Sequence, residues 1–297
     1  MCKNSPEHPG DQMDFSLEQR SANNGSPEPF LKWAGGKRQL LPDLMHRIGR
    51  LGAFRRYHEP FVGGGALFFE LFRRGAIKEP AYLSDNNPNL IVAYQGVKNE
   101  TDAVIELLER HRARHCKEYY YEMRAAHPTS LAAKAARIIY LNRTCFNGLF
   151  RENSKGEFNV PMGRYKAPRI CDEPNLRAVA EALKKAHLDT RPFQSVLDRA
   201  KPGDFVYFDP PYHPVSDTAS FTAYQKGGFA EQDQRALAAV ARELSTRGVC
   251  LLLSNSWTPL VRDLYADFAI EQVFARRSVN SRADKRGAVA EALVRNF

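Results

Sequence analysis

The segment YHEPFVGGGALFFELFR, residues 57–73, determines the class of fold. Its first six residues indicate a strand, three glycines then turn the chain, and its last eight residues have the apolar spacing of a helix. A second short strand, Ala81 to Ser84, follows and leads into Asp85. This alternation of strand, turn and helix predicts a parallel sheet with helices on both of its faces.

The same alternation continues on both sides of this segment. A helix is predicted after Lys37, and the pattern resumes with a helix over about 175–186. Further strands are predicted at Phe205 to Phe208, Val249 to Leu253 and Ala290 to Val294, with a helix around Leu237, Val240 and Leu244. We therefore expect one α/β domain that is interrupted in its middle.

The interruption, residues 100–172, follows a different pattern. Two helices are predicted there, and the polar segment 144–165 is expected to form an exposed loop or hairpin. Residues 1–29 are rich in Pro, Gly, Ser, Asn and Gln and are expected to be a disordered tail. The α/β domain then comprises residues 30–99 and 173–297, and a mainly helical insertion separates its two parts.

Positive charge is concentrated in the insertion. The chain of 297 residues has 43 Lys and Arg against 34 Asp and Glu, a net charge of +9. Between Arg110 and Arg169 there are thirteen basic and four acidic side chains, whereas the tail has two basic and five acidic ones. A basic block of this size suits a phosphate-binding surface, although a merely soluble basic surface would have the same composition.

Composition excludes several classes of protein. The longest run of aliphatic residues and Cys, Val249 to Leu253, is far shorter than a membrane span, and the N-terminal residues lack the apolar core of a signal peptide. The five cysteines are odd in number and lack CxxC spacing, which disfavours a disulfide framework or a zinc ribbon. The eight histidines show no ligand spacing, so no metal site is expected.

The glycine turn and Asp85 suggest a nucleotide-like ligand. Phe61-Val62-Gly63-Gly64-Gly65 allows the backbone to approach a ligand closely, but it has neither the GxGxxG spacing nor a P-loop ending. Asp85 stands at a strand end, where a carboxylate commonly accepts hydrogen bonds from ribose hydroxyls. Its alternative role is to cap the helix that begins near Asn86.

The most specific motif is Asp209-Pro210-Pro211-Tyr212, which follows the apolar strand at residues 205–208. It therefore lies at the carboxyl edge of the sheet, where open α/β folds bind their ligands. The two prolines stiffen the turn, and Tyr212 offers a flat face for stacking. A carboxylate, a carbonyl and an aromatic plate together suit the exocyclic amine of a planar base; the alternative is an ordinary Pro-rich turn.

These motifs, in this order, resemble the Dam-type DNA adenine-N6 methyltransferases, the alpha group or D12 class. The resemblance extends from Phe30 to Phe297 and is carried by FLKWAGGK (30–37), FVGGG (61–65), Asp85 and DPPY (209–212). It also includes NRTCFNGLFRENSKGEFNVPMGRY (142–165) and SFTAYQKGGFAEQDQRAL (220–237). It implies a mostly parallel, Rossmann-like methyltransferase sheet, with residues 100–172 as an inserted target-recognition domain.

The resemblance implies S-adenosylmethionine as the methyl donor. Trp33, Ala34, Gly35 and Lys37 would border its methionine end, with the Lys37 ammonium facing its carboxylate. The turn containing Phe61, Gly63 and Gly65 would pass close to it, Asp85 would hold its ribose, and Phe193 and Gln194 would lie against its adenine. Asp209, Pro210, Pro211 and Tyr212 would form the catalytic corner, where the donor and an adenine rotated out of the duplex meet.

The resemblance also implies recognition of GATC in double-stranded DNA. The residues expected to contact DNA are Lys32, Phe146, Asn147, Leu149, Arg151, Pro161, Arg164 and Lys166. Arg151 matches the family's guanine-binding arginine, Lys32 would face the flanking guanine, and Phe146 stands where the family usually has Tyr. Arg164, Lys166 and Arg169 would contact phosphates. The alternative is a solvated surface loop.

Two other functions remain open at this stage. One is an amino-methyltransferase of the same fold. Action on cytosine-N4 is disfavoured by DPPY, and action on RNA adenine is disfavoured by the insertion. A DNA-binding protein without catalysis is disfavoured by the intact Lys37, Asp85, Asp209 and Tyr212. Cytosine-C5 chemistry requires a Pro-Cys pair, and none of the 18 prolines precedes a Cys. The expected enzyme is a monomer in the cytoplasm, associated with the nucleoid.

Overall fold

The computed structural model describes residues 25–33, 35–37, 39–215, 229–276 and 288–297. Its centre is a sheet of seven strands in the order β3-β2-β1-β4-β5-β7-β6. The strands are β1 Tyr57–Glu59, β2 Ala81–Asp85, β3 Ala186–Thr190, β4 Phe205–Phe208, β5 Cys250–Ser256, β6 Ala269–Arg276 and β7 Ala288–Arg295. Strands β1 to β5 pair in parallel, and β7 runs antiparallel to both β5 and β6. The predicted mostly parallel α/β sheet is confirmed.

The order of the strands determines where a ligand can bind. The chain goes outward from β1 through β2 to β3, then returns to β4 on the other side of β1. Ligands of open α/β sheets bind beyond the carboxyl ends of the strands at such a reversal. The glycine turn follows β1 and DPPY follows β4, so the topology places these two motifs side by side.

Alternate residues of each strand point to opposite faces, and each face has its own core. On one face, Phe205 and Tyr207 pack with helices α1 Leu41–Leu51, α2 Ala66–Arg73, α3 Pro88–Asn99 and α7 Glu173–Leu183. On the other, Val206 and Phe208 pack with η2 Phe193–Asp198, α9 Glu231–Thr246 and α10 Pro259–Leu264. Because β4 is buried on both faces, packing fixes the position of its carboxyl end.

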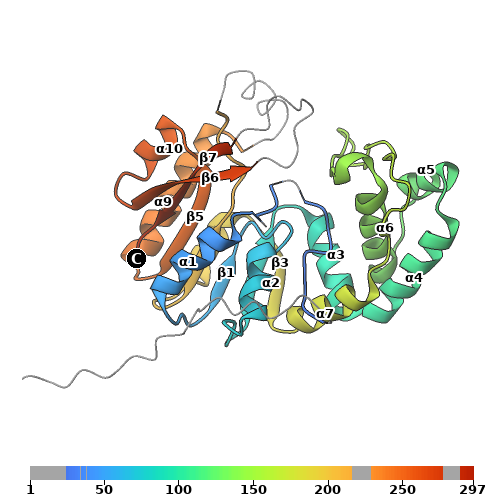
Figure 1. Ribbon diagram of the computed structural model, residues 1–297, viewed down its shortest axis with the longest axis horizontal. Coiled ribbons are helices and arrows are strands. Elements are labelled where there is room, and N and C mark those ends of the chain that lie inside the picture. Colours follow the sequence, from blue (N-terminus) through green and yellow to red (C-terminus); the bar gives the residue numbers. More distant parts are fainter. Residues whose placement is uncertain (1–24, 34, 38, 216–228, 277–287) are drawn as a thin grey trace, which may run out of the picture.

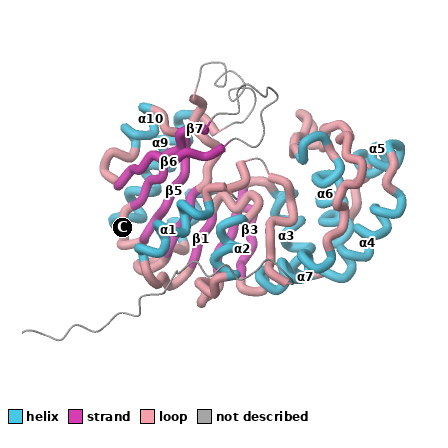
Figure 2. The backbone as a smooth tube through the Cα atoms, viewed as in Figure 1, coloured by secondary structure: helices cyan, strands magenta, loops and turns pink. Residues whose placement is uncertain are grey.

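The helices of residues 101–148 form a lobe beside the sheet (Figures 1 and 2). It contains α4 Thr101–Arg114, α5 Lys117–Ala125, α6 Leu131–Thr144 and η1 Phe146–Gly148. Its apolar core is continuous with that of α2, α3 and α7. Helices α3 and α6 approach closely at Gly96, where an added Cβ would lie 2.3 Å from the Cβ of Ala135.

Three local expectations differ from the structure. The first strand ends at Glu59 instead of Val62, because Pro60 has no N–H to continue the ladder. The helix expected to reach residue 186 ends at Leu183, and the edge strand β3 begins at Ala186. Residues 1–24 of the expected tail lie outside the described residues, while the backbone of Glu28 exchanges two hydrogen bonds with Asn175 on α7.

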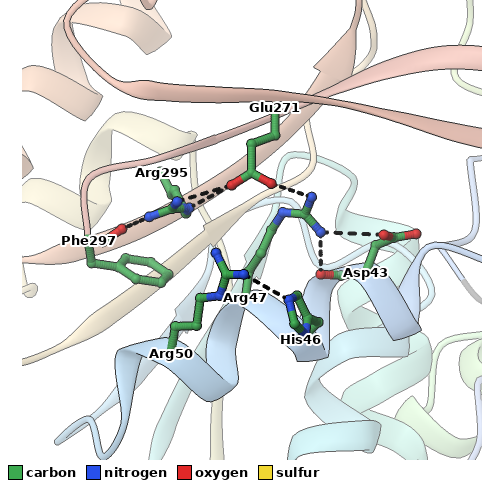
Figure 3. A network of polar contacts seen from close by, with 7 residues as sticks. All are labelled: Asp43, His46, Arg47, Arg50, Glu271, Arg295 and Phe297. Carbon is green, nitrogen blue, oxygen red and sulfur yellow. Dashed lines mark hydrogen bonds and ion pairs between the residues drawn. The ribbon is translucent and has the colours of Figure 1, made fainter.

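A polar network joins the beginning of the fold to its last hairpin (Figure 3). Arg47 on α1 is almost fully buried and contacts Glu271 on β6 at 2.6 Å and Asp43 at 3.4 Å. Glu271 also contacts Arg295 on β7 at 3.1 Å, and Arg295 donates to the main-chain oxygen of Phe297. The network fixes α1, which follows Lys37, against the β6–β7 hairpin.

Candidate active site and nucleic-acid interface

The carboxylate of Asp209 lies directly beyond β4 and is shared by two neighbouring groups. Its Oδ1 lies 2.9 Å from Lys37 Nζ and accepts a hydrogen bond of 3.0 Å from Ser254 Oγ on β5. Ser254 is in turn 3.0 Å from the hydroxyl of Tyr207. Burial raises the pKa of Asp209 above the ordinary range, although Lys37 and Ser254 oppose this rise by favouring the charged form.

The ammonium of Lys37 occupies the corner between Asp209 and Tyr212. It lies 4.3 Å from the centre of the Tyr212 ring and donates to the carbonyl of Gly35 at 2.7 Å. Its side chain is only 11% exposed. The ammonium is therefore held by a carboxylate, a carbonyl and an aromatic face.

The rest of the DPPY corner is held from three other elements. Tyr212 donates its hydroxyl to Glu291 on β7 at 2.8 Å, and Gln234 on α9 donates to the carbonyl of Pro211 at 3.0 Å. Asn255 on β5 accepts from the backbone N–H of His213 at 3.0 Å. Burial and the nearby Asp209 raise the pKa of Tyr212, so its hydroxyl keeps its proton. The Tyr212 side chain is therefore held at its hydroxyl and by the backbone of the residues on either side of it.

Asp85 organises the glycine turn. One carboxylate oxygen accepts from the N–H of Gly63 at 3.2 Å and the other from the N–H of Asn87 at 3.0 Å. The N-cap of α3 is Asn87, whose side chain accepts from Asn89 and Leu90. Asp85 is therefore not the helix cap. Burial raises its pKa, and its backbone hydrogen bonds oppose that rise.

The turn itself needs glycine for steric reasons. Gly63 has φ +47°, and a Cβ there would lie 3.0 Å from the indole of Trp33. Gly65 has φ +67°, and a Cβ there would lie 2.7 Å from the hydroxyl of Tyr94. The structure thus brings Trp33 against the turn, as expected for one wall of a donor site. Ala34, expected to lie beside it, is outside the described residues.

Aromatic side chains pack together next to the glycine turn. Phe61 stacks on Phe193 with their ring centres 5.4 Å apart, and Phe208 and Phe229 meet Phe61 edge to face. Phe193 is buried, whereas Gln194 beside it is exposed. The expected cofactor residues Phe61 and Phe193 thus lie together, although they are more than 130 positions apart in the sequence.

The segment 144–165 is a distorted hairpin with an exposed tip. Isolated bridges pair Cys145 with Met162 and Glu152 with Phe158, and the backbone N–H of Phe146 donates to the carbonyl of Pro161 at 2.9 Å. Asn147 is the only described residue other than glycine with a positive φ, 55°. The expected hairpin is thus present, and its two strands are too irregular to form a continuous ladder.

All eight side chains expected to contact DNA are exposed: Lys32, Phe146, Asn147, Leu149, Arg151, Pro161, Arg164 and Lys166. Phe146 is 48% and Leu149 42% exposed, which is unusual for large apolar side chains in one loop. Arg151 donates to the side chain of Asn159 across the hairpin at 2.8 Å. Lys32 extends over the ring of Tyr165, with Nζ 4.1 Å from its centre. The arrangement presents a mixed apolar and cationic surface.

Comparison with known proteins decides the family. The model of the D12 class N6 adenine-specific DNA methyltransferases matches residues 33–279. The chain is 41% identical over 277 residues to a type II methyltransferase, M1.LlaDCHI, of Lactococcus lactis subsp. cremoris, covering 91% of this chain and 95% of that protein. It is 38% identical over 269 residues to the DNA adenine methylase of Escherichia coli K12, covering 89% and 93%.

The chain belongs to the D12 class N6 adenine-specific DNA methyltransferases. It is therefore an adenine-specific DNA methyltransferase, and DNA is its partner. The resemblance stated from FLKWAGGK, FVGGG and DPPY is confirmed. In the described part of the chain no helix has the length and apolar character to cross a membrane, and no three metal-ligating side chains gather.

Sequence reasoning missed several residues that this methyltransferase places at the site. Ser254 and Glu291 hold Asp209 and Tyr212, and Glu59 lies fully buried beside them, accepting from Tyr57 at 2.9 Å. Burial raises the pKa of Glu59 well above its ordinary range. An acidic residue inside an apolar strand is a signal that could have identified Glu59, whereas Ser254 and Glu291 belong to no local motif.

A hollow of about 650 Å³ lies at the opposite, amino end of the sheet. It is lined by Tyr82, Lys98 and His187, together with two arginines that are already paired: Arg56 with Asp204 and Arg199 with Asp189. None of the residues expected to bind the donor or the base lines it. Asp209, Tyr212 and the glycine turn lie instead at the carboxyl edge.

Proposed function

We propose that this enzyme transfers a methyl group from S-adenosylmethionine to N6 of adenine within GATC in double-stranded DNA. The observation that carries the proposal is the Lys37 ammonium between the carboxylate of Asp209 and the ring of Tyr212. This contact supports the proposal because it shows that Asp209 can accept from a nitrogen that lies against the Tyr212 ring. We also propose that the enzyme acts as a monomer.

The residues around the glycine turn fit the donor. Gly63 lets the turn pass close to Trp33, Asp85 offers a half-buried carboxylate for the ribose, and Lys37 offers a cation for the donor's carboxylate. Trp33, Gly35, Phe61, Gly65 and Phe193 complete this proposed site. S-adenosylmethionine supplies, when bound, a methyl group activated by a sulfonium. The donor's carboxylate would draw Lys37 away from Asp209 and leave that carboxylate free for the base.

The chain's own groups would then orient the adenine amine. Asp209 and the carbonyl of Pro210 would accept its two hydrogens, which favours a pyramidal nitrogen and directs its lone pair toward the methyl group. Tyr212 would stack on the rotated base and return about 1–3 kcal/mol of the cost of unstacking. Positioning and fixed charges supply the rate enhancement, and no covalent intermediate on the protein is needed. The proton leaves after methyl transfer.

Sequence recognition is proposed for the exposed hairpin and Lys32, with residues 100–172 as the target-recognition domain. Arg151 would donate to O6 and N7 of a guanine, Lys32 would contact the flanking guanine, and Asn147 and Leu149 would lie at the central pairs. Phe146 would be inserted as an aromatic wedge, and Pro161 would lie near a thymine methyl. Arg164 and Lys166 would contact phosphates, which confers affinity but not sequence preference.

A methyl-transfer assay tests this proposal. The purified protein is incubated with S-adenosylmethionine carrying a labelled methyl group and with duplexes that contain GATC or one substitution of it. N6-methyladenine within GATC is the expected product, identified by mass spectrometry of the nucleosides. N4-methylcytosine, methylation of RNA in preference to DNA, or methylation of a different sequence would overturn the corresponding part of the proposal.

A further inference from the structure

Asn142, near the C-terminal end of α6, is a buried side chain that makes three hydrogen bonds, all to the proposed DNA-contacting segments. It is 1% exposed. Its Oδ1 accepts from the backbone N–H of Lys32 at 2.7 Å, and its Nδ2 donates to the carbonyl of Lys32 at 2.8 Å. The same Nδ2 donates to the carbonyl of Gly148 at 3.1 Å. One amide thus binds two segments that are over 110 residues apart.

These two segments are also fitted to each other. Gly148 has φ +65°, and a Cβ there would lie 2.6 Å from Cβ and 2.8 Å from Cδ of Lys32. The aliphatic stem of Lys32 therefore packs directly on the backbone of the hairpin, and its ammonium extends on to Tyr165. The position of Lys32 relative to the Phe146–Leu149 loop is set by contacts, not by the chain that connects them.

We propose that Asn142 is a positioning residue for target recognition: it fixes the lysine that contacts the flanking guanine to the loop that contacts the central base pairs. The inference rests on the proposed function of Lys32, Asn147 and Leu149. It assigns to Asn142 no contact with DNA. Its effect on selectivity passes through the backbone of Lys32 and of Gly148.

The physical reason is that, within the described residues, Asn142 is the hydrogen-bond partner of these backbone groups of Lys32 and Gly148, and no other partner is present there. Without the amide, the N–H and C=O of Lys32 and the C=O of Gly148 lose a buried partner, and each is satisfied only if its segment moves toward water. Helix α6 is a rigid element, so the amide holds both segments in a single register. Loss of Asn142 therefore disturbs recognition at two places in the target at once.

The test compares selectivity profiles for Asn142→Ala, Asn142→Asp and Lys32→Ala. The ratio of kcat/KM on GATC to that on each singly substituted duplex is measured. Asn142→Ala is expected to lower this ratio about 5- to 100-fold at both the outer GC pair and the central pairs, whereas Lys32→Ala lowers it only at the outer pair. Asn142→Asp keeps the acceptor for Lys32 N–H, but its second oxygen faces two carbonyls, and it should resemble Asn142→Ala.

Two further variants separate positioning from general loss of structure. Thr144→Ala removes another buried polar group of the same helix end, one that bonds only to the Tyr140 carbonyl within the helix at 2.6 Å. Thr144→Ala should keep the selectivity of the unaltered enzyme, even if it lowers the melting temperature as much as Asn142→Ala does. Gly148→Ala, which pushes Lys32 away from the loop by steric contact, should reproduce the profile of Asn142→Ala while Asn142 is intact.

The outcomes distinguish the inference from the function on which it rests. If the unaltered enzyme shows no preference for GATC, the proposed recognition itself is wrong. If it is selective and Asn142→Ala keeps its profile, or loses selectivity only at the outer pair, the positioning role is wrong. A fall in kcat on GATC with unchanged ratios also contradicts it, because that is the result of a purely structural role.

Discussion

Asp209 is the residue on which the proposed chemistry depends, and its partners indicate how to test it. Asp209→Asn keeps the size of the side chain and an oxygen that can accept from Ser254, but it removes the charge that binds Lys37. We expect methyl transfer to fall by about 10³-fold or more, while binding of S-adenosylmethionine and of DNA is largely retained. Single-turnover transfer and equilibrium binding measure the two effects separately.

Ser254→Ala is the matched control for this substitution. It removes one neutral hydrogen bond to the same oxygen and leaves the carboxylate in place. A loss of about tenfold or less is expected. Near-normal transfer by Asp209→Asn would contradict the assignment, and so would an equally severe defect in Ser254→Ala.

The pH dependence of the enzyme also belongs to this residue. The proposed mechanism requires the carboxylate form, and burial raises the pKa of Asp209 above its ordinary value of 3.8. Activity is therefore complete above this raised pKa and is lost as the pH falls through it. Lys37→Met removes the cation that opposes the rise in the free enzyme, so the acid limb of kcat/KM for the donor should move to higher pH. An acid limb that moves to lower pH would contradict this coupling.

Residue-level prediction from the sequence succeeded where a motif is local and fell short where partners are distant. DPPY and FVGGG are each contiguous, so their place at strand ends followed from the strands before them. Ser254 and Glu291 lie 45 and 82 positions from Asp209, on strands whose pairing is a property of the sheet. No local pattern distinguishes Ser254 from other strand serines, so only the three-dimensional fold reveals it.

At the scale of elements, strand β7 supports the ring of Tyr212, the proposed base-stacking residue. Glu291 on β7 accepts the hydroxyl hydrogen of Tyr212 at 2.8 Å. Glu291→Leu removes this acceptor, and kcat/KM should fall about tenfold because the ring is no longer fixed at its outer end. Fluorescence of 2-aminopurine at the target position reports how well the rotated base is held, and it should change in parallel.

Glu291→Gln provides the comparison for that experiment. Its amide oxygen can still accept from Tyr212, so most of the activity should remain. If Glu291→Leu held the rotated base as well as the unaltered enzyme does, the support of Tyr212 by β7 would not matter for function. An equal loss of activity in both variants would indicate that activity depends on the charge of Glu291 and not on its hydrogen bond.

Elements were predictable in proportion to their apolar patterning. Helix α2 and strand β4 begin and end where the sequence indicated, since Ala66–Arg73 and Phe205–Phe208 are strongly apolar. Edge strands were missed. AHLDT (β3) and AIEQVFAR (β6) include polar residues at exposed positions, and their strand conformation depends on pairing with β2 and β7.

At the scale of the whole molecule, the network around Glu271 joins α1 to the β6–β7 hairpin (Figure 3). Glu271→Gln leaves the buried Arg47 with Asp43 alone. Because Glu271 is about one-third exposed, we expect a loss of only about 1–2 kcal/mol in the free energy of unfolding, measured with urea. Contacts with Arg295 and Arg47 lower the pKa of Glu271 against the effect of burial, so this contribution is present at neutral pH and is lost in acid.

Glu106→Gln on α4 is the control for this measurement. Glu106 pairs with Arg110 on an exposed helix face, with both side chains more than 60% exposed. Its removal should change stability by less than about 0.5 kcal/mol. Equal effects of the two substitutions would show that the network around Glu271 is no stronger than an ordinary surface pair.

The backbone of the hairpin tip limits how the target preference of this enzyme can be altered. Asn147 and Gly148 are consecutive residues with positive φ, 55° and 65°, a conformation that favours Asn, Asp or Gly and disfavours β-branched side chains. Laboratory selection for a new target sequence should therefore accumulate substitutions at Lys32, Leu149 and Arg151, whose backbones carry no such restriction. The two tip residues should persist among the selected clones as an unaltered frame.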